Sequence, residues 1–429
     1  LRTLTAATDR AGSFLWKTLS ASLVYAANRV HEISDDIVSV DNAMKWGFNW
    51  ELGPFETWDA LGAQSVARRL DKDGQPVPQL VRDVLGSSAK TFYHRRVGKT
   101  TYFDFESKQQ REVTYPKGIL VLASLKDQGR VIKKNAGASL IDLGDGVACV
   151  EFHSKMNSIG GDTIQMIHEG LKATREGFCG LVIGNQGQNF SVGANLMLIL
   201  LEAQEQNWEE IDGMIRAFQR VTTAIKYSSQ PVVVAPFGMT LGGGCEIALH
   251  ANRLQASAET YMGLVELGVG LIPAGGGTKE MLVRALQRAG KDPENDLFPQ
   301  LSQALETIAL GKVSGSAHEA KSLGFLSAED GITMNRDRLI ADAKVRVLQL
   351  APGYQKPESA KVFALGNRGL ATLKIGMHQM KRGGFISDHD FAIGSKLAFV
   401  LCGGDCNSIQ EVGEEVILDL EREAFLSLC

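Results

Sequence analysis

The chain has 429 residues and a mass of 46.4 kDa, which is too long for one ordinary domain and predicts two or three. Its hydrophobic content of 44% and charged content of 22% are typical of a soluble globular protein. The formal net charge of −4 and the isoelectric point near 6.1 give no basic footprint, so no nucleic-acid partner is expected.

Six cysteines are scattered along the chain without a C-x-x-C pair, so we expect reduced thiols and a cytoplasmic location. Cys402 and Cys406 could share a helix face, but no His or second pair completes a zinc site, and no metal is expected. No apolar run reaches membrane-spanning length. The chain begins without methionine and ends within a helical pattern, so we expect it to be a piece of a longer polypeptide.

The first expected domain covers residues 1–110. Apolar residues recur at three- and four-residue intervals in SLVYAANRVHEI, DDIVSVDNAMKWG and TWDALGAQSVARRL, which predicts three helices. Asp35 or Asp36 can cap the second helix, and Glu56 can lie in the first turn of the third. The segments TFYHRR, KTTYFDFE and EVTY predict short strands, and nothing in this region points to chemistry.

The segment NRVHEISDDIVSVDNAMKWGFNWELGPFETWDALG resembles the C-terminal helical domain of 3-hydroxyacyl-CoA dehydrogenases, over about residues 20–65. The resemblance implies a Rossmann domain with the NAD site, which would precede Leu1. No G-x-G-x-x-G opens a strand–helix unit here, because LGDGVAC and LGVGLIPAGGG have the wrong spacing. We therefore expect no cofactor in this chain, and NAD only in the absent Rossmann domain.

Residues 111–137 are the expected linker. Within it, YPKGILVLASLKDQGRVIKKNA predicts another short strand with a basic tail. The basic cluster HRRVGK lies just before the linker. We interpret that cluster as solvated surface in preference to a docking site for a CoA phosphate.

From Ala138 the pattern changes to alternating strands and helices. ASLIDLG and VACVEFH predict paired strands around the GDG turn at 144–146. The helix DTIQMIHEGLKATRE follows, with Asp162 as the expected N-cap, and then the buried strand CGLVIGN. This alternation predicts an α/β fold with parallel strands and right-handed crossovers.

The most informative stretch is PVVVAPFGMTLGGGCEIALHANRLQASAETYMGLVELGVGLIPAGGG, at 231–277. A strand, a glycine turn and a helix place free backbone N–H groups and a positive helix end at one point. Glu246 lies in the first turn of that helix, and Glu266 follows in GLVE. Two carboxylates beside free N–H groups are the parts that acid/base chemistry next to a developing oxyanion needs.

Together with NFSVGANL at 189–196, this stretch resembles the crotonase (enoyl-CoA hydratase/isomerase) superfamily, over about residues 138–340. The resemblance implies a crotonase-like ββα spiral for this core. The expected fold class is thus α/β, with an N-terminal all-α domain and a C-terminal helical region at 341–429. In the family such C-terminal helices cover the acyl pocket or serve oligomer contacts, which implies a homo-oligomer or a thiolase-type partner.

The resemblance also assigns roles to residues. The backbone N–H groups of Ala194 and Gly243 would form an oxyanion hole for a coenzyme A thioester, with Glu246 activating water and Glu266 protonating the α-carbon. Asn195 stands where the family usually has Asp, although Asn can still cap the next helix. Binding of the acyl-CoA substrate would involve Lys155, Met156, Ser191, Gly193, Gly242 and Pro273.

The presence of both glutamates favours an enoyl-CoA hydratase, as one part of a multifunctional fatty acid β-oxidation protein. The first alternative is a Δ3,Δ2-enoyl-CoA isomerase, since isomerases of the family commonly keep only the second glutamate. The other alternative is a non-catalytic scaffold that binds acyl-CoA.

Overall fold

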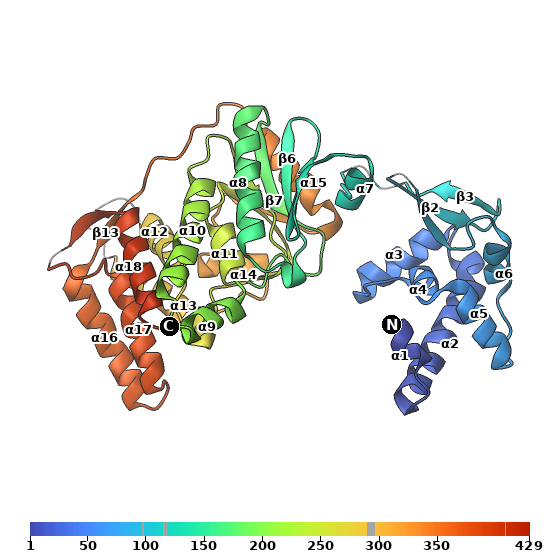
Figure 1. Cartoon of the computed structure of the whole chain (residues 1–429), viewed down its shortest axis with the longest axis horizontal. Coiled ribbons are helices and arrows are strands. Elements are labelled where there is room, and N and C mark those ends of the chain that lie inside the picture. Colours follow the sequence, from blue (N-terminus) through green and yellow to red (C-terminus); the bar gives the residue numbers. More distant parts are fainter. Residues whose placement is uncertain (97, 115, 117, 290–296, 408) are drawn as a thin grey trace. The chain divides into compact units, whose positions relative to one another are not determined.

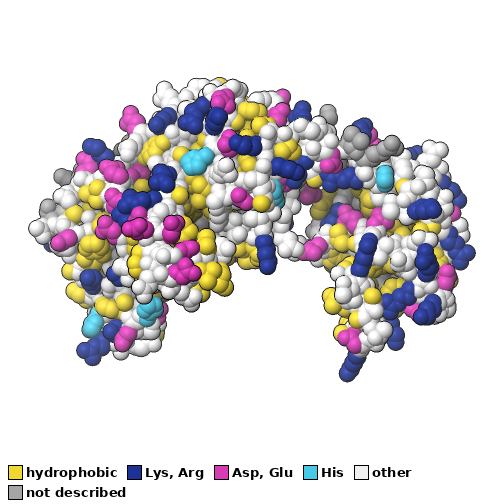
Figure 2. All heavy atoms as spheres, in the orientation of Figure 1, with side chains coloured by type: hydrophobic (Ala, Val, Ile, Leu, Met, Phe, Trp, Pro, Cys, Tyr) yellow, Lys and Arg dark blue, Asp and Glu magenta, His cyan; other side chains and the backbone are white. Residues whose placement is uncertain are grey.

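The structure is a computed structural model that describes residues 1–96, 98–114, 116, 118–289, 297–407 and 409–429. The chain divides into two compact units, Leu1–Lys117 and Gly118–Cys429 (Figure 1). On the face shown in Figure 2, basic and acidic side chains are interspersed over both units. Among the described residues, no helix has the length and apolar character that a membrane crossing requires.

The first unit consists of helices followed by a small sheet. Asp36 caps the helix after it by accepting from the Ser39 amide at 2.6 Å, as one of the two expected caps. The strands form an antiparallel sheet in the order β1-β2-β3, and β3 ends at Glu112, the first residue of the expected EVTY strand, whose last residue lies outside the described residues. The elements are α1 (Arg2–Ala6), α2 (Arg10–Ile33), α3 (Ile37–Phe48), α4 (Pro54–Leu61), α5 (Ala63–Lys72), α6 (Gln79–Gly86), β1 (Tyr93–Arg96), β2 (Lys99–Asp104) and β3 (Gln109–Glu112).

Asp41 connects three elements of this unit. Its carboxylate accepts from the amides of Phe55 and Glu56 at the start of α4, at 2.8 and 3.0 Å, and from the Tyr93 hydroxyl at 2.8 Å. Burial raises the pKa of Asp41 to about 7. Because Phe55 and Trp58 of α4 are fully buried in the core of this unit, we assign the G-P-F-E segment a structural role.

The second unit is built on a seven-stranded sheet in the order β12-β10-β8-β7-β6-β5-β4. The strands from β6 to β12 run parallel, whereas β4, β5 and β6 pair antiparallel. This sheet confirms the α/β fold class. Its strands are β4 (Val131–Lys134), β5 (Ala138–Asp142), β6 (Val147–Phe152), β7 (Gly180–Gly184), β8 (Val232–Val234), β10 (Arg253–Ser257) and β12 (Gly331–Thr333).

Helices cover the sheet, and a two-stranded parallel ladder, β9 (Gly238–Leu241) with β11 (Thr260–Gly263), lies beside the glycine turn. The short 3₁₀ turns are η1 (Lys155–Asn157), η2 (Glu266–Val269) and η3 (Arg336–Arg338). The helices are α7 (Leu122–Asp127), α8 (Gly161–Glu176), α9 (Leu196–Gln204), α10 (Trp208–Lys226), α11 (Gly243–Leu249), α12 (Gly277–Ala289), α13 (Phe298–Ala309), α14 (Ala317–Leu323), α15 (Leu339–Leu350), α16 (Gly366–Arg382), α17 (Asp388–Leu401) and α18 (Glu414–Leu426).

Three local expectations differ from the structure. The expected short strand of the linker is β4, over VIKK, and the segment LASLKD before it forms the unexpected helix α7, in which Leu122 and Leu125 both reach the core. The C-terminal region contains an antiparallel pair, β13 (Lys361–Ala364) with β14 (Gln410–Gly413), besides its helices. Asp162 lies in the first turn of α8, whereas Gly160 occupies the N-cap and Thr163 bonds the Gly160 amide.

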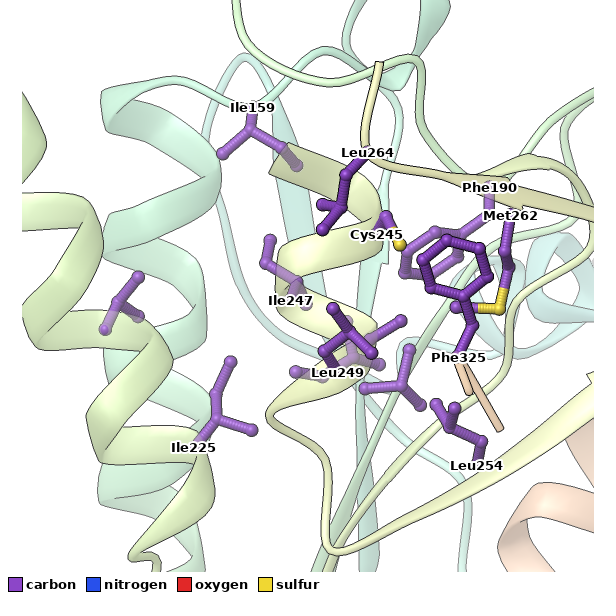
Figure 3. Packing of buried hydrophobic residues seen from close by; sticks show 14 of the residues in the cluster. Ile159, Phe190, Ile225, Cys245, Ile247, Leu249, Leu254, Met262, Leu264 and Phe325 are labelled. Carbon is purple, nitrogen blue, oxygen red and sulfur yellow. The ribbon is translucent and has the colours of Figure 1, made fainter. Parts of the chain in front are cut away.

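Helix α11 lies inside the core of the second unit, and all seven of its residues are buried. Figure 3 shows Cys245, Ile247 and Leu249 of this helix pointing into packed apolar side chains, with Phe190 and Phe325 among them. A close-packed surrounding restricts the movement of a helix. The backbone at the start of α11 is therefore held in one position, which matters for the site described next.

Candidate active site

Two loops that are far apart in sequence lie side by side at the start of α11. Ser191 forms a parallel bridge with Thr240, and the Leu241 amide donates to the Ser191 carbonyl at 2.9 Å. Gly193 has φ +97° and Gly242 has φ +51°, a left-handed region that glycine adopts without strain. A Cβ added at Gly193 would lie 3.2 Å from the amide nitrogen of Gly243, so the loops approach each other too closely for a side chain there.

This approach brings the amides of Ala194 and Gly243 together. A Cβ built on Gly243 would lie 3.5 Å from the nitrogen of Ala194. Among the hydrogen bonds between described residues, neither amide has an acceptor. Two neighbouring N–H groups without acceptors, one of them at the positive end of a helix, are suited to bind a negatively charged oxygen.

Glu246 lies in the first turn of α11 and is only 3% exposed. Its Oε1 accepts from the amides of Gly275 and Gly277, each at 2.8 Å. Burial raises the pKa of Glu246 to about 7, although these two amides and the charge of Lys279 act in the opposite direction. With Oε1 occupied by two donors, Oε2 is the oxygen that is left for a ligand.

Glu266 begins the turn η2, and its Oε2 is buried without a hydrogen-bond partner. Its other oxygen would be 3.3 Å from a Cβ at Gly242, which places the carboxyl beside the glycine turn. Burial, and next the charge of Glu246, raise the pKa of Glu266 well above its usual value. Glu266 therefore holds its proton more tightly than an ordinary carboxyl, whereas Glu246 titrates near neutrality.

Both glutamates and both amides line one cavity of about 610 Å³. Helix α9, which has no buried residue, contributes apolar side chains to its wall, and α10 and α18 contribute aromatic ones. Such a mainly apolar pocket with a few convergent polar groups is typical of a small-molecule site. Its apolar wall includes Leu196, Leu198, Ile199, Met214, Ile215, Phe218, Leu271 and Phe425.

Of the other residues expected to bind substrate, some line this cavity and some do not. Gly193 and Gly242 line the cavity. Ser191 is fully buried behind it, and its Oγ accepts from the Gly193 amide at 3.2 Å, so it has a structural role in the loop. Lys155 and Pro273 are not among the lining residues, and Pro273 is buried.

Met156 lines a second, separate cavity of about 430 Å³, which lies against Asn157, Gln186 and Asn189. Both Met156 and Asn157 have positive φ, at 57° and 51°. Left-handed backbone costs energy in residues other than glycine, so the surrounding structure holds this turn in place. Ser154 lines both cavities, and the turn thus separates them.

The sequence analysis missed the partners of Glu246. The glycine triplet at 275–277 supplies them, because a Cβ at Gly275 or Gly277 would lie 2.8 Å from one of the two oxygens of that carboxylate. The triplet itself is the sequence signal for these partners. Among the described residues, no group of His, Cys, Asp and Glu is arranged to hold a metal, and the six cysteines are free.

Gly275→Ala tests this packing. The new methyl would lie 2.2 Å from the Phe218 ring and 2.8 Å from Glu246, so we expect unfolding to become easier by about 1–3 kcal/mol, as overpacking usually does. Urea unfolding of the chain measures this change. Gly213→Ala is the control, since a Cβ in that α10 position meets nothing within 4 Å. Equal stability of both variants would contradict the described packing.

Comparison with known proteins agrees with this site. Residues 142–291 match the enoyl-CoA hydratase/isomerase family. A protein of Bacillus subtilis (strain 168) named as a 3-hydroxyacyl-CoA dehydrogenase is 51% identical over 421 residues, which are 98% of this chain and 52% of that protein. A protein of Rickettsia prowazekii (strain Madrid E) named as a fatty acid oxidation complex trifunctional enzyme is 26% identical over 424 residues, 97% of this chain and 51% of that protein.

A third relative, named as the enoyl-CoA hydratase/isomerase YngF of Bacillus subtilis (strain 168), is 29% identical over 209 residues, which are 49% of this chain and 71% of that protein. The chain spans half the length of the first two relatives, 52% and 51%. The family match covers the loops of both candidate oxyanion-hole amides and both glutamates. Residues 142–291 of the chain are thus similar to the enoyl-CoA hydratase/isomerase family, the stretch that holds all four groups of the candidate site.

Proposed function

We propose that the cavity binds a trans-2-enoyl-CoA thioester and adds water across its C=C bond to give a 3-hydroxyacyl-CoA. The observation that carries this proposal is the convergence of four groups. Two amides without acceptors and two carboxyl groups, each with one oxygen free of hydrogen bonds, line the same cavity. The family match to hydratases and isomerases supports the substrate class.

The reaction follows from these positions. The Oε2 atom of ionised Glu246 takes a proton from water while the water oxygen bonds to the β-carbon. The electron pair of the C=C bond moves toward the carbonyl, and the amides of Ala194 and Gly243 stabilise the resulting charge on the thioester oxygen. Protonated Glu266 then gives its proton to the α-carbon. One oxyanion donor of this kind contributes about 3 kcal/mol to the transition state.

Water addition leaves the oxidation state of the substrate as a whole unchanged, so the proposed reaction uses no cofactor. We assign the coenzyme A part to the turn at Lys155 and Met156, where both residues are exposed. Two of the relatives are named for 3-hydroxyacyl-CoA dehydrogenation and fatty acid oxidation. We extend the role in fatty acid oxidation from these relatives to the present chain. The NAD-dependent activity would belong to the half of the relatives that this chain does not cover.

An assay with crotonyl-CoA tests the proposal, because hydration removes the absorbance of the conjugated thioester. The protein should consume crotonyl-CoA and release 3-hydroxybutyryl-CoA. Binding of crotonyl-CoA without turnover would instead support an acyl-CoA-binding scaffold and would refute the proposal.

The rate of hydration should depend on pH through Glu246. Since burial raises the pKa of this carboxyl to about 7, and only its ionised form can accept a proton, kcat/KM should rise between pH 5 and about 7. It should fall again where Glu266, whose pKa is also raised, loses the proton that the α-carbon needs. Initial rates measured across pH 5–9 give this profile. A flat profile over that range would show that no group with a raised pKa acts as the base.

A Δ3,Δ2-enoyl-CoA isomerase is the second candidate. The observation in its favour is that the Oε2 atom of Glu266 has no partner and could shuttle a proton between two carbons, while Glu246 is held by two amides. 3-Hexenoyl-CoA distinguishes the two functions. An isomerase would convert it at a rate that is independent of Glu246, and would leave crotonyl-CoA unchanged.

A further inference from the structure

A third buried carboxyl lies next to the turn that holds Glu246. Glu421, on the C-terminal helix α18, is fully buried. Its Oε1 accepts from the amides of Gly276 and Thr278, both at 3.2 Å, and its Oε2 accepts from the Lys279 amide at 3.4 Å. Five consecutive amides at the start of α12 are thus shared between two carboxylates.

The sharing follows an alternating order. The amides of Gly275 and Gly277 point to Glu246, whereas those of Gly276, Thr278 and Lys279 point to Glu421. From Gly275 to Thr278, successive amides therefore point to alternate carboxylates. Any rotation of the turn that loosens the bonds to Glu421 also moves the two donors that orient Glu246.

Side chains of helix α10 donate hydrogen bonds to the backbone carbonyl groups of the same turn. Thr222 Oγ1 donates to the Gly275 carbonyl at 2.8 Å, and the Gln219 amide group donates to the Ala274 carbonyl and to Leu418 of α18, both at 2.9 Å. The turn is also tightly packed against His250, because a Cβ at Gly276 would lie 2.7 Å from the ring of that residue. Glu421 therefore accepts from three of the five amides of a turn whose carbonyl groups are bonded to α10.

A buried ion cluster fixes α18 at its other end. Lys226 Nζ lies 2.5 Å from Glu280 and 3.0 Å from Glu414, the first residue of α18, and Lys279 Nζ lies 2.9 Å from Glu414. Paired buried charges of this kind are costly to break, since the partner would be left uncompensated. The cluster therefore keeps α18 in the register that brings Glu421 to the turn.

We propose that Glu421 is a positioning residue for the water-activating step: through the turn 275–279 it sets the orientation of the Glu246 carboxylate in the cavity. This inference rests on the proposed hydratase function. It assigns Glu421 no contact with substrate. It also predicts that the α-carbon chemistry of Glu266, which does not depend on this turn, is independent of Glu421.

The test compares two reactions in the same variants. Crotonyl-CoA hydration needs both glutamates, whereas deuterium exchange at C2 of butyryl-CoA in D₂O, read by NMR, needs only Glu266 and the oxyanion hole. For Glu421→Ala we expect kcat for hydration to fall about 10- to 100-fold with KM within about 3-fold, as for loss of an interaction used in the transition state. The exchange rate should stay within about 3-fold of the wild type under the same reasoning.

Conservative variants separate positioning from general damage. Glu421→Gln keeps an oxygen for the Gly276 and Thr278 amides and should retain at least about a third of the wild-type kcat. In a Glu246→Gln background, Glu421→Ala should add little further loss, because the two residues act as a unit. If Glu421→Ala does not fold, Glu421→Asp, whose carboxylate falls short by one methylene, should show the same selective loss of hydration. Glu423→Gln is the matched control, an exposed glutamate on the same helix.

The outcomes are distinct. If the wild type hydrates crotonyl-CoA and Glu421→Ala, or Glu421→Asp in its place, keeps its full kcat, the positioning role is wrong while the proposed function stands. If hydration and exchange fall together, Glu421 supports the whole fold and the inference is likewise overturned. If the wild type itself does not hydrate, the proposed function is refuted, and the positioning role is refuted with it.

Discussion

Replacing Glu246 by Gln should lower kcat for crotonyl-CoA hydration by about 1000-fold, within the range that general acid–base groups contribute. The carbonyl of the new side chain can still accept from the Gly275 and Gly277 amides, so the turn keeps its shape. The amide nitrogen that replaces Oε2 has no basic lone pair and cannot accept the proton of water. Initial rates with crotonyl-CoA measure the effect, and KM should change little because the substrate contacts are retained.

The control for this variant is Glu209→Gln, an exposed glutamate in the first turn of α10. Deuterium exchange at C2 of butyryl-CoA should be unaffected in Glu246→Gln. If Glu246→Gln hydrates crotonyl-CoA within about 3-fold of the wild type, Glu246 is not the base, since loss of such a group exceeds that range.

Replacing Glu266 by Gln should abolish both reactions at the α-carbon. Hydration and C2 exchange should each fall by about 1000-fold, because a carboxamide cannot donate or accept the proton that moves at that carbon. The new side chain would have the same size as that of Glu266 and would remain beside Gly242, so binding of the thioester should persist. Stopped-flow hydration and NMR exchange on the same sample provide both rates.

The comparison of hydration and C2 exchange in the two variants distinguishes the roles of the two glutamates. Glu246→Gln should lose hydration alone, and Glu266→Gln should lose hydration and exchange. Undiminished exchange in Glu266→Gln would show that another group handles the α-proton, and the roles assigned to the two carboxyls would have to be abandoned.

Much of the fold could be predicted from the sequence, because its signals are local. The strand run VVV at 232–234 and the glycine turn before α11 both occur where the pattern indicated them. Helix α7 was not predicted, because a short apolar run does not distinguish a strand from one turn of a buried helix. Strands β13 and β14 were missed because they pair with each other across 45 residues of intervening chain, between Ala364 and Gln410.

The candidate site was likewise predictable in part. The family resemblance pointed to Ala194, Gly243, Glu246 and Glu266, and all four line one cavity. The role of Glu421 could not be predicted, because a Glu in the helical pattern VILDLEREAFL is ordinarily a solvent-facing residue. Only the placement of α18 against the turn 275–279 shows that this carboxyl is fully buried and bonded to three amides.

Helix α9 bears on substrate choice. Five of its apolar residues are between 44% and 61% exposed (Leu196, Met197, Leu198, Leu200 and Leu201). Two of them also line the cavity, which is consistent with an acyl chain leaving the active site along this helix. Asn195 caps α9 by accepting from the Met197 amide at 3.2 Å, so the residue that departs from the family pattern still holds the helix start.

A crystal structure of the chain with bound 3-hydroxybutyryl-CoA would test the central claim most directly. We expect the thioester oxygen within hydrogen-bond distance, about 3 Å, of both the Ala194 and Gly243 nitrogens. The 3-hydroxyl should face Glu246, and C2 should face Glu266. A thioester oxygen bound elsewhere, or a ligand with the two glutamates on the same carbon, would contradict the account.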